Sequence, residues 1–372
     1  MSAPRLLSAA LEPLADFRHT EGRHTRLYVE LERLFPIAGF VRPALSGPAD
    51  WTVKALAFHP NRDAWRGRVW LSPLAFRLRT ELAERELQRW DGRYDLVFQQ
   101  QTLFAPGRRS DRPYVIYTDN TYTQTERQYP AWAPLGRRAS RRWRALEQET
   151  FRHARAVFGK SEWVCDAIVN DYGCDPGRVF AVGHGTNSLV PSLEGKRYDR
   201  PIALFVGNKY ELKGVPTLLA AWQAVHARLP DARLRIVGVE PRGADEQSPS
   251  VEWLGYVSDW QKMEELYAQA SLFVLPTQFE AFGLAVVEAM GNGLPCVVTR
   301  VGALPELVED DAGLLVPPRD PRALADALVA LLSDPARAAA MGAAGYRKVQ
   351  EHLTWRVVAE RMAPHLERAA AG

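Results

Sequence analysis

Cysteine and metal-binding patterns are scarce in this chain of 372 residues. The three cysteines, Cys165, Cys174 and Cys296, are an odd number at unrelated spacings and form no CxxC motif. Neither disulfides nor a structural zinc site are therefore expected. The eight histidines form no HExxH or comparable spacing, so we expect no metal bound by protein ligands.

Long apolar runs are also missing. No stretch of about 18 apolar residues occurs, so no membrane-spanning helix is predicted. Residues 1–15 carry Arg5 and then Glu12, and lack the charge-then-hydrophobic order of a secretory signal. Hydrophobic residues make up 47% and charged residues 24%, as in folded globular proteins. The sequence predicts a cytoplasmic protein.

The length predicts two domains. Residues 1–195 hold 28 Lys or Arg against 22 Asp or Glu, whereas residues 196–372 hold 19 against 22, so the first half is the basic one. From Asn187 to Pro201, two prolines and a glycine stand among charged and small residues before a new apolar run begins. This break predicts a linker, with domains over 1–195 and from 196 onward.

Beyond the linker, short apolar runs suited to buried strands alternate with helical periods. The predicted strands are Ile202–Gly207, Arg233–Gly238, Val251–Gly255, Ser271–Pro276, Pro295–Arg300 and Gly313–Val316. In the first half, strands are expected near 95–99, 114–118, 156–159 and 179–182, with a helix over about 138–154. The alternation predicts an α/β protein with two Rossmann-like parallel sheets, whose ligands bind beyond the carboxyl ends of the strands.

The segment Ser271–Thr299 carries the strongest chemical signal. A strand ends at Pro276, a loop contains Glu280, and a helix begins at about Gly283–Leu284. The unpaired amides of a first helical turn favour a pyrophosphate, and a glycine lets a ligand approach the backbone. Glu288 lies within an apolar run, so it needs a hydrogen-bond partner. That partner is either another protein group or a vicinal diol of a ligand. Alone, Glu280 would be a solvated loop acid.

A second signal is the segment Gly207–Gly214, with the sequence GNKYELKG, again between a strand and a helix. Lys213 precedes a glycine and the helical period 215–225, so its ammonium can reach the same edge of the sheet as Leu284. A lysine at such a place is usually a solvated surface residue. The nearby Glu280 and Glu288 favour a binding role instead.

Together these segments resemble the retaining, nucleotide-sugar-dependent glycosyltransferases of family four, which have the two-domain GT-B fold. Glu280 and Glu288, in the context E-x-F-G-L-x-x-x-E-A-M, resemble the paired-glutamate motif of that family, and Gly207–Gly214 resembles its phosphate loop. The similarity covers residues 145–357 well and the first 110 poorly. Trp253–Val257 is similar to the strand and turn that contact the nucleobase in that family. Two further segments, Phe158–Ser161 and Val182–Asn187, resemble the end of its first domain.

The resemblance implies a hexosyltransferase that moves a sugar from a nucleotide-diphosphate-sugar to a glycan, lipid or small-molecule acceptor, with retention and without a metal or other cofactor. It implies an acceptor domain (1–195) and a donor domain (196–354) facing across a cleft, and a helix (355–372) crossing back to the first. Glu280 would bind the transferred sugar, Glu288 the ribose, and Lys213 the leaving diphosphate. The remaining implied donor contacts are Gly207, Asn208, Lys209, Tyr256, Val257, Ala281, Phe282, Gly283 and Leu284.

Three positions depart from the family pattern. Asn208 stands where the family usually has an arginine, with Lys209 one place on. Only Gly22 is available where a paired-glycine loop is usual. Asp119 lies where a histidine is frequent, which gives it either a catalytic role or one in positioning the acceptor.

A basic run follows Trp132. Five arginines, Arg137, Arg138, Arg141, Arg142 and Arg144, fall within eight residues. They are either a solvated helix face or a contact for the anionic inner face of a membrane or a phosphate-bearing acceptor. A nucleotide-sugar epimerase on the same fold remains an alternative. A non-enzymatic protein that binds nucleic acid or another anion is a weaker one, because no recognition helix or aromatic platform accompanies the arginines.

Overall fold

The computed structural model describes residues 3–13, 24–106, 112–186, 191–243, 246, 248–308 and 311–372. The chain divides into two compact units, residues 1–185 with 355–372, and residues 186–354. The boundary therefore lies ten residues before the expected one at 195. The backbone N–H of Thr186 donates to the carbonyl of Leu353 at 2.8 Å, which joins the start of the second unit to its end.

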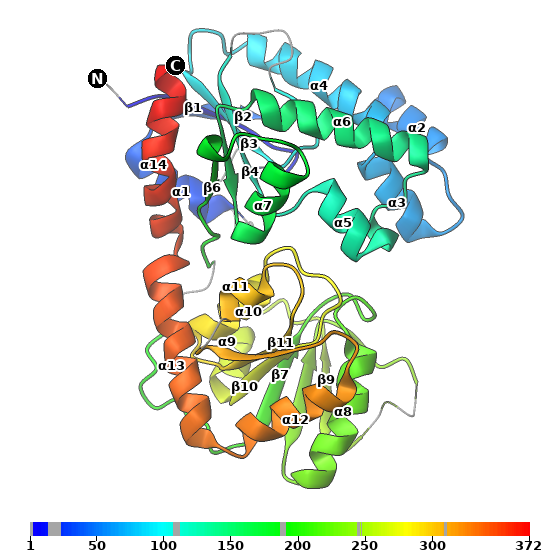
Figure 1. The fold of residues 1–372 in the computed structure, drawn as a ribbon, viewed down its shortest axis with the longest axis vertical. Coiled ribbons are helices and arrows are strands. Elements are labelled where there is room, and N and C mark those ends of the chain that lie inside the picture. Colours follow the sequence, from blue (N-terminus) through cyan, green and yellow to red (C-terminus); the bar gives the residue numbers. More distant parts are fainter. Residues whose placement is uncertain are drawn as a thin grey trace. The chain divides into compact units, whose positions relative to one another are not determined.

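The first unit contains a six-stranded parallel sheet in the order β2-β1-β3-β4-β5-β6 (Figure 1). All residues of β3, β4 and β5 are buried, which explains their continuous apolar runs. The first two strands had not been predicted. The strands are β1 (Leu6–Ala9), β2 (Ile37–Val41), β3 (Leu96–Gln100), β4 (Tyr114–Thr118), β5 (Ala156–Gly159) and β6 (Val179–Ala181).

Helix α14 (Trp355–Ala371) belongs to this unit and packs beside α1 (Thr25–Leu34). Trp355, Val358 and Met362 share a core with Leu27 and Tyr28, so the end of the chain covers a sheet formed by its beginning (Figure 1). The other helices are α2 (Gly47–Leu56), α3 (Arg62–Trp70), α4 (Pro73–Gln88), α5 (Tyr122–Gln128), η1 (Pro130–Trp132), α6 (Arg137–His153), α7 (Glu162–Asn170) and η2 (Pro176–Arg178).

The second unit contains another six-stranded parallel sheet, in the order β12-β11-β10-β7-β8-β9. All six strands predicted in this half are confirmed. They are β7 (Ile202–Val206), β8 (Arg233–Val237), β9 (Val251–Gly255), β10 (Leu272–Leu275), β11 (Cys296–Thr299) and β12 (Gly313–Val316). The helices are α8 (Val215–Arg228), α9 (Trp260–Gln269), α10 (Leu284–Gly291), α11 (Leu304–Val308), α12 (Pro321–Leu332) and α13 (Pro335–His352).

The order of strands in the second sheet brings the two predicted binding segments together. β7 and β10 are far apart in sequence but hydrogen-bond to each other in parallel. Their carboxyl ends therefore meet at one edge, where α8 and α10 begin. None of the described helices combines the length and the hydropathy that crossing a membrane requires.

Candidate donor site

The loops after β7 and β10 are bonded to each other directly. The hydroxyl of Thr277 and the backbone N–H of Gln278 both donate to the carbonyl of Leu212, at 3.0 and 2.7 Å. Gly214 has φ +77°, and a β-carbon there would lie 1.9 Å from the carbonyl oxygen of Pro276. Only glycine fits this position, so the start of α8 is held close against the end of β10.

Lys213 and Glu280 form an ion pair at the junction of these loops. The Nζ of Lys213 donates to Oε2 of Glu280 at 2.5 Å, and their side chains are 18% and 16% exposed. The residues are 67 positions apart in sequence. The structure thus brings together the cation and the acid that the motifs had indicated separately, and both side chains keep some access to solvent.

Helix α10 begins beside this pair with an unusual backbone at Gly283. Its φ is +107°, and a β-carbon would lie 2.7 Å from Cδ2 of Leu304. This glycine is therefore required by backbone conformation and by packing against α11, a reason additional to the expected approach of a ligand. The backbone N–H groups of Leu284 and Ala285 have no acceptor among the described residues, and they leave partial positive charge at the helix start.

Glu288 lies on α10, one turn beyond Leu284. Its Oε2 accepts a hydrogen bond from the hydroxyl of Tyr267 on α9 at 3.1 Å. Burial raises the pKa of this carboxyl, and the bond from Tyr267 opposes the rise. A protein group thus satisfies one carboxylate oxygen of Glu288, which is one of the two kinds of partner expected from the sequence. The side chain stays partly exposed, so the carboxylate can also accept from another hydroxyl.

Tyr267 and Lys196 were not identified from the sequence. The ammonium of Lys196 donates to the backbone carbonyls of Tyr267 and Ala268 at 2.6 and 3.1 Å, near the carboxyl end of α9. Burial lowers the pKa of Lys196 to about 7. The lysine and the last turn of α9 thereby support the tyrosine that holds Glu288. No local pattern marks this contact, because it joins three separate segments.

The other predicted donor contacts lie in the same unit with differing exposure. Asn208, Lys209 and Tyr256 are exposed, whereas the side chain of Phe282 is buried in the core. Gly207 continues the sheet, since its N–H donates to the carbonyl of Val237 at 3.0 Å. The remaining three, Val257, Ala281 and Leu284, are half-buried.

Asp119 belongs to the first unit, directly after β4. The Nζ of Lys160, after β5, donates to Asp119 at 3.3 Å and lies 3.2 Å from Nε2 of His24. Nδ1 of His24 lies 3.1 Å from Glu12. Burial and the charge of Lys160 lower the pKa of His24. The sequence had indicated Asp119 but not these buried partners, and Gly22 lies outside the described residues.

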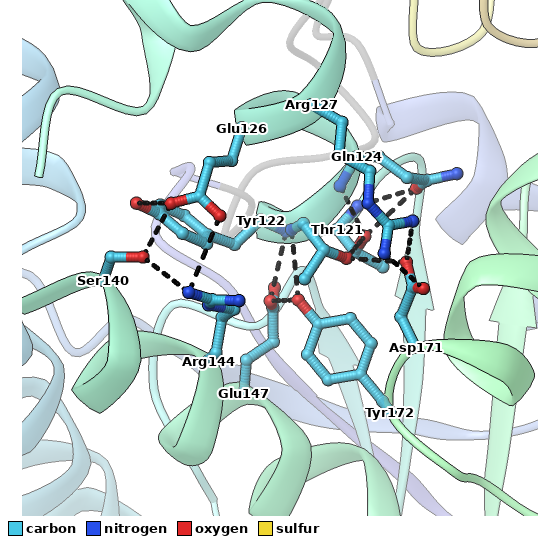
Figure 2. Close-up of polar contacts among 11 residues, drawn as sticks. Thr121, Tyr122, Gln124, Glu126, Arg127, Ser140, Arg144, Glu147, Asp171 and Tyr172 are labelled. Carbon is cyan, nitrogen blue, oxygen red and sulfur yellow. Dashed lines mark hydrogen bonds and ion pairs between the residues drawn. The ribbon is translucent and has the colours of Figure 1, made fainter. Parts of the chain in front are cut away.

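A second buried carboxylate supports the segment after Asp119. Glu147 accepts hydrogen bonds from Tyr172, from the hydroxyl of Thr102 at 2.8 Å and from the N–H of Tyr122 at 3.1 Å. Figure 2 shows Glu147 and Tyr172 directed toward each other below the start of α5. Burial raises the pKa of Glu147 to about 7. The group fixes the backbone at Tyr122, three residues from Asp119.

The arginine run forms the first half of α6, and its members differ in their polar contacts. Arg144 donates to Ser140 at 3.3 Å and lies 3.8 Å from Glu126, as Figure 2 shows. The other four, Arg137, Arg138, Arg141 and Arg142, are exposed and have no ion-pair partner in the described part of the chain. The basic surface that the run forms is therefore made chiefly by these four.

Comparison with known proteins adds a family match in the second unit. Residues 200–334 match the model described as Glycosyl transferases group 1. An alpha-maltose-1-phosphate synthase from Mycolicibacterium smegmatis is 31% identical over 249 residues, 58% of this chain and 64% of that protein. A GDP-mannose-dependent monoacylated alpha-(1-6)-phosphatidylinositol monomannoside mannosyltransferase from Corynebacterium glutamicum is 35% identical over 163 residues, 40% and 42%. The chain thus covers less than two thirds of either relative.

Solved structures match over nearly the whole chain. Sucrose-phosphate synthase from Thermosynechococcus elongatus has a TM-score of 0.71 at 21% identity, covering 99% of both chains. HepE from Anabaena, solved in complex with UDP and glucose, has a TM-score of 0.63 at 15% identity, covering 98% of this chain and 99% of that one. At these identities the likeness concerns the fold, which is the GT-B fold of two Rossmann-like parallel sheets.

Proposed function

Because residues 200–334 match the model described as Glycosyl transferases group 1, we propose that the chain is a retaining glycosyltransferase that uses a nucleotide-diphosphate-sugar. The observation that carries the proposal is the Lys213–Glu280 pair, placed beside the start of α10 with Glu288 one turn further along. A cation, open helix amides and two carboxylates thus share one sheet edge. Diphosphate and sugar hydroxyls require this combination of charges and acceptors.

Each group has a distinct task in this proposal. The diphosphate binds at the N–H groups of Leu284 and Ala285, and Lys213 turns from Glu280 to a phosphate oxygen. Glu280, released from the lysine, accepts from hydroxyls of the transferred sugar. Glu288, held by Tyr267, accepts from the ribose. The other donor contacts are the loop residues Gly207, Asn208 and Lys209, the nucleobase segment at Tyr256 and Val257, and the backbone of Ala281, Phe282 and Gly283.

Breaking the sugar–phosphate bond builds negative charge on the departing diphosphate. Fixed positive groups aimed at that charge stabilise the transition state more than the ground state. Lys213 and the start of α10 supply them, so the proposal includes no resident cofactor. Asp119, held by Lys160, positions the acceptor hydroxyl rather than forming a covalent intermediate, which agrees with a retaining transfer.

The donor identity can be tested by binding. One relative is named for GDP-mannose and one structural neighbour was solved with UDP and glucose, so a panel of UDP-, GDP-, ADP- and dTDP-sugars covers the candidates. A ligand that binds the folded state raises the unfolding temperature with its concentration. A donor that gives such a shift and then yields a glycosylated acceptor supports transfer. No shift with any of the four would contradict the proposal.

Epimerisation on the same fold is the second candidate, because it uses the same donor groups. An epimerase releases nucleotide and an altered sugar without an acceptor product. Chromatography of the products with and without added sugar acceptors therefore separates the two reactions.

We further propose that the basic surface of α6 contacts an anionic partner, either the inner face of a membrane or a phosphate-bearing acceptor. Arg137, Arg138, Arg141 and Arg142 carry this contact, with Arg144 contributing less because of Glu126. Each basic residue near an anionic bilayer contributes about 1 kcal/mol. Sedimentation with neutral and anionic vesicles tests the membrane form, and equal binding to both would exclude it.

A further inference from the structure

An exposed apolar surface lies on α2 and α3, at the same end of the first unit as the start of α6 (Figure 1). Trp51 and Leu56 on α2 are 73% and 74% exposed, and Phe58, in the turn after α2, is 67% exposed. Trp70 at the end of α3 is 47% exposed. We call these four residues the hairpin surface. Large apolar side chains gathered in this way mark a contact surface.

The spacing of these residues aligns them on the outer face of each helix. On α2, the exposed residues Trp51, Thr52, Ala55 and Leu56 occupy two adjacent i, i+4 rows, while Val53 on the opposite side is the only buried residue of the helix. Helix α3 has no buried residue at all. Its exposed stripe is Arg62, Arg66 and Trp70, again spaced by four. Apart from Arg79 of α4, whose guanidinium lies 5.2 Å from the centroid of the Trp70 ring, these outer faces are exposed.

The hairpin that α2 and α3 form is nevertheless held in place by hydrogen bonds and ring contacts. Nε1 of Trp65 donates to the carbonyl of Lys54 at 2.9 Å, and the Trp65 ring meets that of Phe58 edge-on with centroids 6.4 Å apart. Nε of Arg68 donates to the carbonyl of Pro134 at 3.0 Å, which ties α3 to the segment that leads into α6. The exposed side chains therefore project from a supported structure.

We propose that the hairpin surface inserts into the interfacial region of an anionic lipid bilayer. Tryptophan and phenylalanine beside arginines are the composition of helices that lie in a membrane interface. Arg62 and Arg66 have no ion-pair partner in the described residues, like the four exposed arginines that begin α6. A second copy of the chain is a poorer occupant, because a symmetric contact would place these like charges together.

This proposal shares its partner class with that made for α6, but it assigns a different surface and needs no transfer activity for its test. Binding is measured by co-sedimentation with vesicles of phosphatidylcholine alone or with 30 mol% phosphatidylglycerol. We expect Trp51→Ser/Leu56→Ser to weaken binding to the anionic vesicles by about 30-fold, and Arg62→Gln/Arg66→Gln by about tenfold. Leu34→Ser and Trp260→Ser, which alter large apolar side chains elsewhere that are 39% and 41% exposed, should bind as the unchanged protein does.

A label at the surface gives an independent readout. The three native cysteines are buried, so Ala55→Cys can be labelled selectively with an environment-sensitive fluorophore, with exposed Ala336→Cys on α13 as the control. A blue shift at position 55 alone, and only with anionic vesicles, supports insertion even if the serine variants fold poorly. No vesicle binding, no blue shift at position 55, or dimerisation without lipid that Trp51→Ser/Leu56→Ser abolishes, would overturn the proposal.

Discussion

The Lys213–Glu280 pair predicts opposite effects of two substitutions on the binding of a nucleoside diphosphate. Lys213→Met keeps the length of the side chain but removes its charge from the diphosphate. Losing one partner of a close, partly desolvated charge pair costs about 2–5 kcal/mol. In the unchanged protein, Lys213 gives up its contact with Glu280 when it binds the diphosphate, and this offsets part of the cost. The expected loss of binding free energy is therefore about 2 kcal/mol, or about 30-fold in Kd.

Glu280→Gln should act in the other direction. In the protein, Oε2 of Glu280 competes for the ammonium at 2.5 Å. Ion pairs near a surface contribute about 0.2–1 kcal/mol. Freeing the lysine should therefore strengthen binding of UDP or GDP about two- to fivefold. The same variant should transfer sugar more slowly, because it lacks the carboxylate for the sugar hydroxyls.

Isothermal titration with UDP and GDP measures both effects, and thermal unfolding shows whether the variants fold. Arg228→Gln is a matched control, because it removes a cation paired with Asp326 at the far end of α8. Its Kd should be unchanged. Unchanged affinity in Lys213→Met, or weaker binding in Glu280→Gln than in Lys213→Met, would refute the placement of the diphosphate beside α10.

Three further predictions concern buried groups. Burial raises the pKa of Glu147 to about 7, so its stabilising contribution is complete below about pH 4.5 and lost as the pH rises to 7. In urea unfolding, the protein should lose about 3 kcal/mol over that range relative to Glu147→Gln; parallel pH profiles would contradict this. The pKa of Lys196 is lowered, so its effect on stability changes with pH in the opposite direction. Relative to Lys196→Met, the free energy of unfolding should rise between pH 7 and 10; a difference that stays constant over this range would contradict the prediction. Tyr267→Phe should weaken nucleotide binding about three- to tenfold, because Glu288 loses the hydroxyl that holds its carboxylate in place for the ribose; nucleotide analogues without the ribose hydroxyls should bind both forms equally.

The sequence predicted the second half of the fold better than the first. Strands β7 to β12 are short, largely apolar runs separated by helical periods, so local pattern was sufficient to identify them. In the first half, β1 and β2 were missed. Strand β2 is only partly buried over most of its length, and β1 has four residues including Ser8. Neither gives a strong local signal, and both are defined by pairing with distant segments.

The candidate site shows the same division. Lys213, Glu280, Gly283 and Glu288 could be named from their motifs, because a strand exit and a helix start leave a mark in the local sequence. The residues that hold them in place could not be named from the sequence. Tyr267 lies 21 residues from Glu288, and Lys160 lies 136 residues from His24.

By itself, the sequence determined the alternation of strands and helices, the positions of the two candidate binding loops and the residue types at their ends, since these depend on periodicity and local backbone chemistry. The tertiary structure decided which strands are neighbours, which acid lies next to Lys213, and which unit the last helix joins. It also decided that Trp51, Leu56, Phe58 and Trp70 remain largely exposed. Contacts between distant segments depend on how whole elements pack, and no window of neighbouring residues contains that information.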